Sequence, residues 1–133
     1  MGESRTESSY SIIVVDDERD VASVLQRGLE REGFKVCAFD DSEEALSHFT
    51  PGSYDFLITD VSMPKLNGYE LYSKIARQDP KIKVCFLTGY EIFDQSFRMA
   101  HPNSNLAFVM HKPVSITALS DRIRSELGER SIR

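Results

Sequence analysis

Long hydrophobic runs are absent from this sequence of 133 residues. A helix that spans a membrane needs about 18 or more consecutive apolar residues, and no stretch of the chain approaches that length. The N-terminal segment also lacks the apolar core of a secretion signal. These absences predict a soluble protein of the cytoplasm that makes no membrane contact.

Positive charge and cysteine are also scarce. The chain has 16 basic and 21 acidic residues, a formal net charge of -5, which leaves no basic footprint for a nucleic-acid backbone. Its 2 cysteines, Cys37 and Cys85, lie in apolar, strand-like runs without a second cysteine or a histidine at metal-ligand spacing. We therefore expect no zinc site and predict two small, buried thiols in a reducing cytosol.

Internal repeats and low-complexity segments are absent as well, and the length suits one globular domain. We expect a disordered leader over residues 1–10, one folded domain over residues 11–128 and a short tail over residues 129–133. A chain of this length has no room for a second catalytic or DNA-binding domain.

Short apolar runs alternate with amphipathic segments along the rest of the chain. Alternation of this kind predicts an α/β fold, in which helices cover both faces of a parallel sheet. The first and third runs are unbroken, as expected of central strands. The predicted strands are residues 11–15, 34–39, 54–59, 82–87 and 106–110. A fourth helix is expected from about Tyr90, before a loop over residues 101–105.

The expected ends of the other helices follow from local signals. Gly33 is a natural stop for the first helix. The second helix begins near Asp41, and Glu44 three positions later suits reciprocal capping. The third begins near Gly68, and Ser115 caps the last.

Polar residues follow four of the predicted strands. Asp16 and Asp17 come after the first strand and Asp60 after the third, while Thr88 and Lys112 come after the fourth and fifth. Right-handed crossovers bring the carboxyl ends of parallel strands to one edge, where ligands bind in open α/β folds. We therefore expect three carboxylates, a hydroxyl and an ammonium to converge there.

This combination of side chains suits phosphoryl chemistry. Several carboxylates in one crevice repel one another unless a cation neutralises them, and so few carboxylates favour Mg²⁺ over a Ca²⁺ cage. An aspartate can attack phosphorus to give an aspartyl phosphate. Asp60 is the candidate acceptor because it stands alone, whereas Asp16 and Asp17 lie together where they would hold the metal. Lys112 and Thr88 would face the incoming phosphoryl group.

These residues resemble, in this order, the receiver domain of two-component response regulators, from about Ser11 to Leu127. The matching pieces are Asp16-Asp17, Asp60 with Met63-Pro64 and Gly68, Thr88-Gly89, and Lys112-Pro113. The resemblance implies a doubly wound, flavodoxin-like sheet of strand order 2-1-3-4-5. It also implies a phosphorelay module that is phosphorylated on Asp60 by a sensor histidine kinase or a histidine phosphotransfer protein.

The resemblance further implies individual roles. Mg²⁺ would be held by Asp17, Asp60 and the backbone carbonyl of Ser62, with Asp16 acting through a metal-bound water. Lys112 would pair with the phosphoryl oxygens and would precede a cis peptide bond. In the active state Thr88 would swing towards the phosphoryl group. The implied strand order separates the two cysteines, which argues against a disulfide.

Two departures from the family pattern affect the output. Receivers usually carry an aromatic residue three positions before the lysine, and here that position is Val109, with Phe108 beside it. A loop over residues 101–105 replaces a small Gly-Ala element near the face of the fourth helix, fifth strand and fifth helix. We expect an unknown downstream protein to bind that face and the choice of partner to be unusual. The family pattern does not say how phosphorylation of Asp60 is communicated to this face when Val109 replaces the aromatic residue.

Several functions remain as alternatives. A regulatory switch leads, followed by a phosphotransfer intermediate or phosphate sink, and then by a scaffold that needs no phosphate. A receiver taken from a larger DNA-binding regulator and a homodimer formed on phosphorylation also stay open. A haloacid-dehalogenase type phosphatase needs a second aspartate two residues after the nucleophile, where Ser62 stands, so we expect a regulatory module and not an enzyme.

Overall fold

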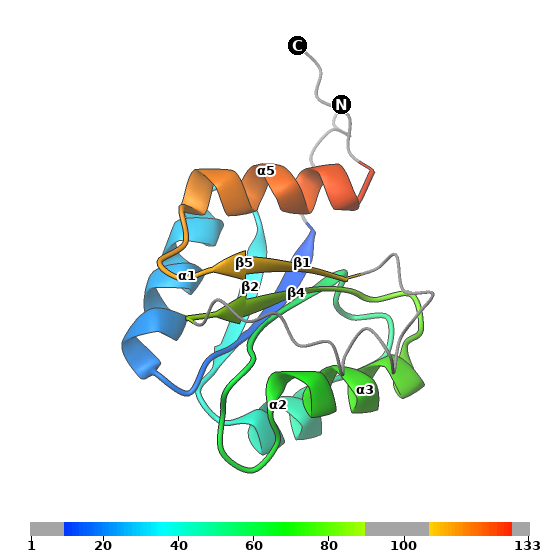
Figure 1. Ribbon diagram of the computed structural model, residues 1–133. Helices are drawn as coiled ribbons and strands as arrows, with labels where there is room; N and C mark the ends of the chain where they lie inside the picture. The colour runs from blue at the N-terminus through cyan, green and yellow to red at the C-terminus, as the bar shows by residue number, and fades with distance from the viewer. Residues whose placement is uncertain (1–9, 90–106, 129–133) are drawn as a thin grey trace.

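The computed structural model describes residues 10–89 and 107–128, in which five parallel strands form one sheet of order β2-β1-β3-β4-β5 (Figure 1). The predicted fold class and strand order are therefore confirmed. The strands are β1 (Ser11–Val15), β2 (Lys35–Phe39), β3 (Phe56–Asp60), β4 (Lys83–Thr88) and β5 (Ala107–His111). The leader except for Tyr10, the expected fourth helix, the loop over residues 101–105 and the tail lie outside the described residues.

Helices cover both faces of the sheet, which explains the unbroken apolar runs in its centre. The described helices are α1 (Arg19–Arg31), α2 (Ser42–His48), α3 (Gly68–Gln78) and α5 (Ile116–Glu126). Figure 1 shows α1 and α5 on one side of the sheet and α2 and α3 on the other. Alternate β1 residues pack into the two layers, with Ile12 and Val14 towards α1 and α5, and Ile13 and Val15 towards α2 and α3.

The helix ends follow the predicted signals with one difference. Gly33 has a positive φ of 103° just after α1, and the Ser115 side chain caps α5. At α2, the Asp41 carboxylate accepts two backbone hydrogen bonds from the first turn. The complete reciprocal pair occurs instead at α3, between Asn67 and Glu70. Asparagine at the N-cap and glutamate three positions later make the same reciprocal bonds as the serine or threonine pattern.

The prediction that both cysteines are buried is wrong for Cys37. Cys85 is buried in β4, whereas Cys37 is exposed, because β2 is an edge strand of the sheet. Both thiols are free, and they lie on non-adjacent strands, as expected.

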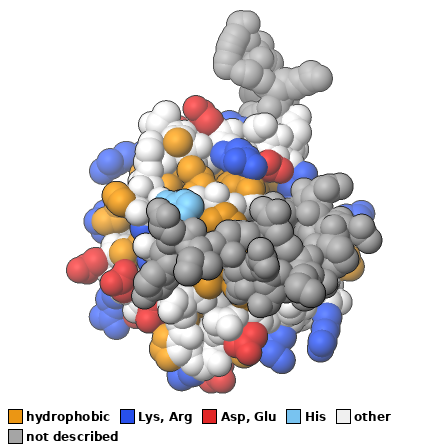
Figure 2. Space-filling model, in the orientation of Figure 1, with side chains coloured by type: hydrophobic (Ala, Val, Ile, Leu, Met, Phe, Trp, Pro, Cys, Tyr) orange, Lys and Arg blue, Asp and Glu red, His pale blue; other side chains and the backbone are white. Residues whose placement is uncertain are grey.

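The outer surface of the described residues carries mixed charge. Figure 2 shows acidic and basic side chains interspersed around one face of the molecule. None of the helices that the structure describes has the length and apolar character to cross a membrane.

Candidate functional site

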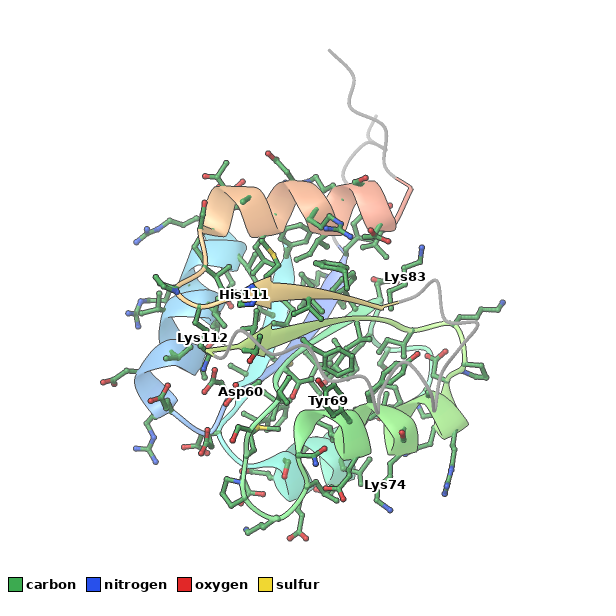
Figure 3. All side chains as sticks on the ribbon, in the orientation of Figure 1. Asp60, Tyr69, Lys74, Lys83, His111 and Lys112 are labelled. Carbon is green, nitrogen blue, oxygen red and sulfur yellow. The ribbon has the colours of Figure 1, made fainter. Side chains whose placement is uncertain are left out.

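The predicted site residues meet at the carboxyl end of the sheet. Asp60 and Thr88 are the last residues of β3 and β4, one position further into the sheet than predicted, because Asp60 pairs with Leu87 and Thr88 pairs with His111. Figure 3 shows Asp60 and Lys112 at this end of the sheet. The Lys112 backbone N–H donates to the Thr88 carbonyl at 2.9 Å, which ties the ends of β4 and β5 together.

Three carboxylates form a compact acidic group. One oxygen from each of Asp16, Asp17 and Asp60 lies within 4.8 Å of the others. Asp16 is fully buried and Asp60 is 7% exposed, whereas Asp17 faces solvent. Burial and then the negative charge of Asp16 raise the pKa of Asp60 to about 6, although Lys112 opposes the change. The attraction of Lys112 therefore does not fully offset the burial and mutual repulsion of these carboxylates.

The Lys112 ammonium is the cation that faces this group. Its Nζ lies 2.9 Å from Asp16 Oδ2, 3.4 Å from Asp60 Oδ1 and 3.6 Å from Glu18 Oε1. Burial alone would lower the pKa of Lys112, but the ion pairs with Asp16 and Asp60 outweigh it, so the pKa lies above its usual value. The lysine is therefore charged at neutral pH and shared among three carboxylates.

The donor set fits a hard divalent cation. With the three carboxylates of the acidic group, Glu18 and Lys112 all ionised, the site has a formal charge of −3; Glu18 pairs with Lys112 and is not part of the acidic group. The buried Asp16 Oδ2 touches the lysine as an ion pair, but no hydrogen bond among the described residues is aligned on this oxygen. Oxygen ligands from a few carboxylates, with positions left for water and phosphate, suit Mg²⁺.

The loop over residues 61–67, which joins Asp60 to α3, is held from two sides. On one side, Gly68 N–H donates to the Val61 carbonyl at 2.9 Å. A Cβ atom at Gly68 would lie 2.3 Å from the backbone oxygen of Asp60, so only glycine permits this approach of α3. The glycine at position 68, predicted as the start of the third helix and part of the family motif, is thus required because a larger residue would clash with the Asp60 backbone. Ser62, whose carbonyl was the predicted metal ligand, lies exposed in this segment.

On the other side, the N-terminus of α2 holds the same segment. The buried Ser42 hydroxyl accepts the Leu66 N–H at 3.3 Å and donates to the Pro64 carbonyl at 3.4 Å. Lys65 has a left-handed φ of 70° and pairs with Asp41 at 2.7 Å. Sequence reasoning missed these contacts, because they join residues more than twenty positions apart. It also missed Glu18, although Glu18 directly follows the acidic pair.

The two neighbouring β5 residues face opposite sides of the sheet. Phe108 packs in the α1 and α5 layer, 5.8 Å from the Phe56 ring, and the Arg122 guanidinium lies 4.0 Å above it. Val109 packs in the α2 and α3 layer. Phe108 therefore does not stand in for the aromatic residue that the family usually has at the Val109 position.

An apolar hollow of about 500 Å³ borders the site between α1 and the start of α5. Val21 and Val24 line it from α1, Val114 and Ile116 line it from the other side, and Lys112 also lines it. Val24 is 53% exposed, and it is the large hydrophobic side chain that lies exposed among the described residues. The hollow thus offers apolar surface next to the lysine that faces Asp60.

Residues 12–124 of the chain match the family of response regulator receiver domains. The transcriptional regulatory protein PrrA of Mycobacterium leprae is 32% identical over 123 residues, 92% of this chain but 52% of PrrA, so the chain spans about half the length of that relative. The response regulator receiver protein CpdR of Brucella abortus is 29% identical over 119 residues, 87% of this chain and 95% of CpdR.

Solved structures agree with the family match. A response regulator receiver domain protein from Clostridium thermocellum is 30% identical with a TM-score of 0.78, covering 89% of this chain and 94% of that one. The receiver domain of the hybrid histidine kinase CckA is 32% identical with a TM-score of 0.73, covering 88% and 98%. The chain therefore belongs to the response regulator receiver domains of two-component systems, a family of regulatory modules.

Proposed function

We propose that this domain is a phosphorylation-dependent switch that accepts a phosphoryl group on Asp60. The observation that supports this most directly is the position of Lys112 Nζ, 2.9 Å from Asp16 and 3.4 Å from Asp60 at the rim of an acidic group. An ammonium placed there meets both the acceptor and the oxygens of an arriving phosphoryl group. A carboxylate oxygen of Asp60 attacks phosphorus, the bond to the donor's histidine nitrogen breaks, and that nitrogen keeps the electron pair.

Mg²⁺ would be held by Asp17, Asp60 and the Ser62 carbonyl, with Asp16 behind a bound water. When bound, the ion neutralises negative charge on the phosphoryl oxygens during transfer. Lys112 pairs with one of these oxygens, and the Thr88 hydroxyl donates to another. The low exposure of Asp16 and Asp60 excludes bulk water and strengthens each of these interactions.

The phosphoryl donor is a histidine kinase or a histidine phosphotransfer protein, and we place its docking site at the apolar hollow. The hollow shares Lys112 with the site, so a helix that buries apolar side chains against Val24 brings its histidine next to Asp60. Replacing Val24 by glutamate should slow transfer from a histidine protein while leaving phosphorylation by a small acyl phosphate unchanged.

Phosphorylation changes the charge at Asp60 to about −2, which draws Lys112 away from Asp16. Because the Lys112 backbone is bonded to Thr88, this movement reaches the ends of β4 and β5. We propose that a downstream protein, or a second copy of the domain, reads the change on the face of the fourth helix, β5 and α5. The fourth helix lies outside the described residues.

The decisive experiment is incubation with Mg²⁺ and acetyl phosphate, followed by intact mass and oligomeric state. The wild-type protein should gain one phosphoryl group and Asp60→Asn none. A wild-type protein without the adduct would refute the proposal. Return of the phosphoryl group to a histidine protein, without any change of binding partner, would favour a phosphotransfer intermediate over a switch.

The surrounding domain organisation also belongs to the proposal. We place the folded domain at residues 11–128, with a leader before it and a tail after it. PrrA, named as a transcriptional regulatory protein, is about twice as long as the matched region, whereas CpdR is matched over 95% of its length. The relatives therefore include a longer transcriptional regulatory protein and a receiver protein hardly longer than the matched region.

A further inference from the structure

Glu18 makes a third ion pair with Lys112, in addition to those of Asp16 and Asp60. Its Oε1 lies 3.6 Å from Lys112 Nζ, and its side chain is 66% exposed, whereas those of Asp16 and Asp60 are 0% and 10% exposed. The lysine is thus held between two buried carboxylates and one carboxylate at the solvent side. Of the three carboxylates that pair with Lys112, Glu18 is therefore the one that faces the solvent from which a phosphoryl donor approaches.

The backbone of Glu18 is held in place by a hydrogen bond, but its side chain does not cap the start of helix α1. The Glu18 N–H donates to Asp16 Oδ1 at 2.9 Å, which holds this residue beside the acidic group. Glu18 is the N-cap residue of α1, yet its side chain makes no capping hydrogen bond. N-caps favour short side chains such as serine or aspartate that reach the first-turn N–H groups. Among the described residues, the ion pair with Lys112 is therefore the polar contact that the Glu18 carboxylate makes.

We propose that Glu18 is an electrostatic brake on the phosphorylation of Asp60. In the resting domain, its carboxylate shares Lys112, and a phosphoryl group can use the full charge of the lysine only after displacing it. The same negative charge also repels an anionic donor as it approaches. This inference rests on the proposed role of Asp60 and goes further, because it assigns the control of transfer rate to a residue outside the acceptor and metal-binding set.

The brake should be moderate and sensitive to donor charge. Glu18 is largely exposed, so solvent weakens its interactions, and exposed ion pairs contribute little. We expect Glu18→Gln to raise the rate of phosphorylation by about twofold to fivefold at low ionic strength. The gain should be larger for acetyl phosphate, which is a dianion at neutral pH, than for phosphoramidate, which is mainly a monoanion.

The test compares wild type, Glu18→Gln and Asp20→Asn with saturating Mg²⁺. Asp20 lies in the first turn of the same helix, and its substitution removes the same charge. Asp20 lines the apolar hollow together with Lys112, but the described residues show no ion pair between the two, so Asp20→Asn reports the effect of a nearby charge that does not pair with the lysine. Second-order rates are measured by intact mass with both donors, at low ionic strength and at about 1 M salt, where screening acts within about 3 Å. Thermal unfolding in chelator checks that the variants are folded.

A second measurement observes the lysine directly and needs no phosphorylation. In the chelated protein, the NMR signal of the Lys112 ammonium should shift, and its protons should exchange faster with water, in Glu18→Gln but not in Asp20→Asn. Supporting results are this change together with a rate gain that is larger for acetyl phosphate and disappears at high salt.

The inference is overturned if Glu18→Gln is as slow as wild type, or if Asp20→Asn gains as much. It is also overturned if the gain is equal for both donors and persists at high salt. These results are distinct from failure of the proposed function, in which wild type itself forms no adduct, and that outcome overturns the brake as well.

Discussion

Neutralising Asp60 should stabilise the metal-free protein, although Asp60 is the proposed functional residue. The pKa of Asp60 is raised to about 6, first by burial and then by the charge of Asp16. Because this pKa lies above that of an exposed aspartate, the folded state binds the proton more tightly than the unfolded state. The ionised carboxyl therefore destabilises the fold, with no penalty below about pH 4 and the full penalty above about pH 6.

The size of the effect follows from the two pKa values. The difference between about 6 and 3.8 is about 2 pH units, which corresponds to about 3 kcal/mol at 1.4 kcal/mol per unit. This figure already includes the opposing attraction of Lys112, and it is an upper limit because asparagine also has a polar group to bury. We expect Asp60→Asn to gain about 1 to 2 kcal/mol in free energy of unfolding at pH 7.5.

Urea unfolding in chelator at pH 7.5 and at pH 4 measures this gain. The advantage of Asp60→Asn should be large at pH 7.5 and should shrink towards zero at pH 4, where the wild-type carboxyl is mostly protonated. Asp121→Asn, which removes an exposed carboxylate on α5, should change the stability by less than about 0.5 kcal/mol at either pH. If Asp60→Asn is no more stable than the wild type at pH 7.5, the ionised Asp60 carboxylate does not destabilise the fold and this reasoning is refuted.

Three further predictions concern the surroundings of Asp60. Mg²⁺ should raise the unfolding temperature of the wild type more than that of Asp60→Asn, as measured by calorimetry, because the substitution removes a ligand. Gly68→Ala should destabilise the fold by about 1 to 3 kcal/mol in urea unfolding, because its Cβ would lie 2.3 Å from the Asp60 oxygen, whereas Gly89→Ala meets nothing within 4 Å. Ser42→Ala should lower the free energy of unfolding by about 1 to 2 kcal/mol and speed amide hydrogen exchange at Leu66, because the Leu66 N–H loses its acceptor. Ser47→Ala, on the exposed face of α2, should change neither quantity.

The sequence allowed the sheet and the meeting point of Asp16, Asp60 and Lys112 to be predicted because strand periodicity and parallel topology decide both. The carboxyl end of each strand is a position along the chain, so the residues found there can be read directly. The exposure of Cys37 was mispredicted because an apolar run looks the same in an edge strand and in a central one. The hydroxyl of Ser42 gave no signal, since a serine after an N-cap residue is common and its partner lies in another loop.

The two β5 neighbours limit the routes by which the proposed phosphorylation of Asp60 is communicated to the proposed partner-binding face of β5 and α5. Val109 has no ring to rotate, and Phe108 is fixed on the other side of the sheet between Phe56 and Arg122. We propose Lys112 as the connection, because its side chain contacts Asp60 and its backbone N–H donates a hydrogen bond to the Thr88 carbonyl at the end of β4. If this connection carries the signal, the partner should still distinguish the two phosphorylation states of Val109→Tyr, which introduces an aromatic residue. Lys112→Arg should fold, but the partner should bind its two phosphorylation states equally. Binding measured by calorimetry with each phosphorylation state of each variant decides between the two routes, and loss of the difference in Val109→Tyr would show that β5 side-chain packing carries the signal instead.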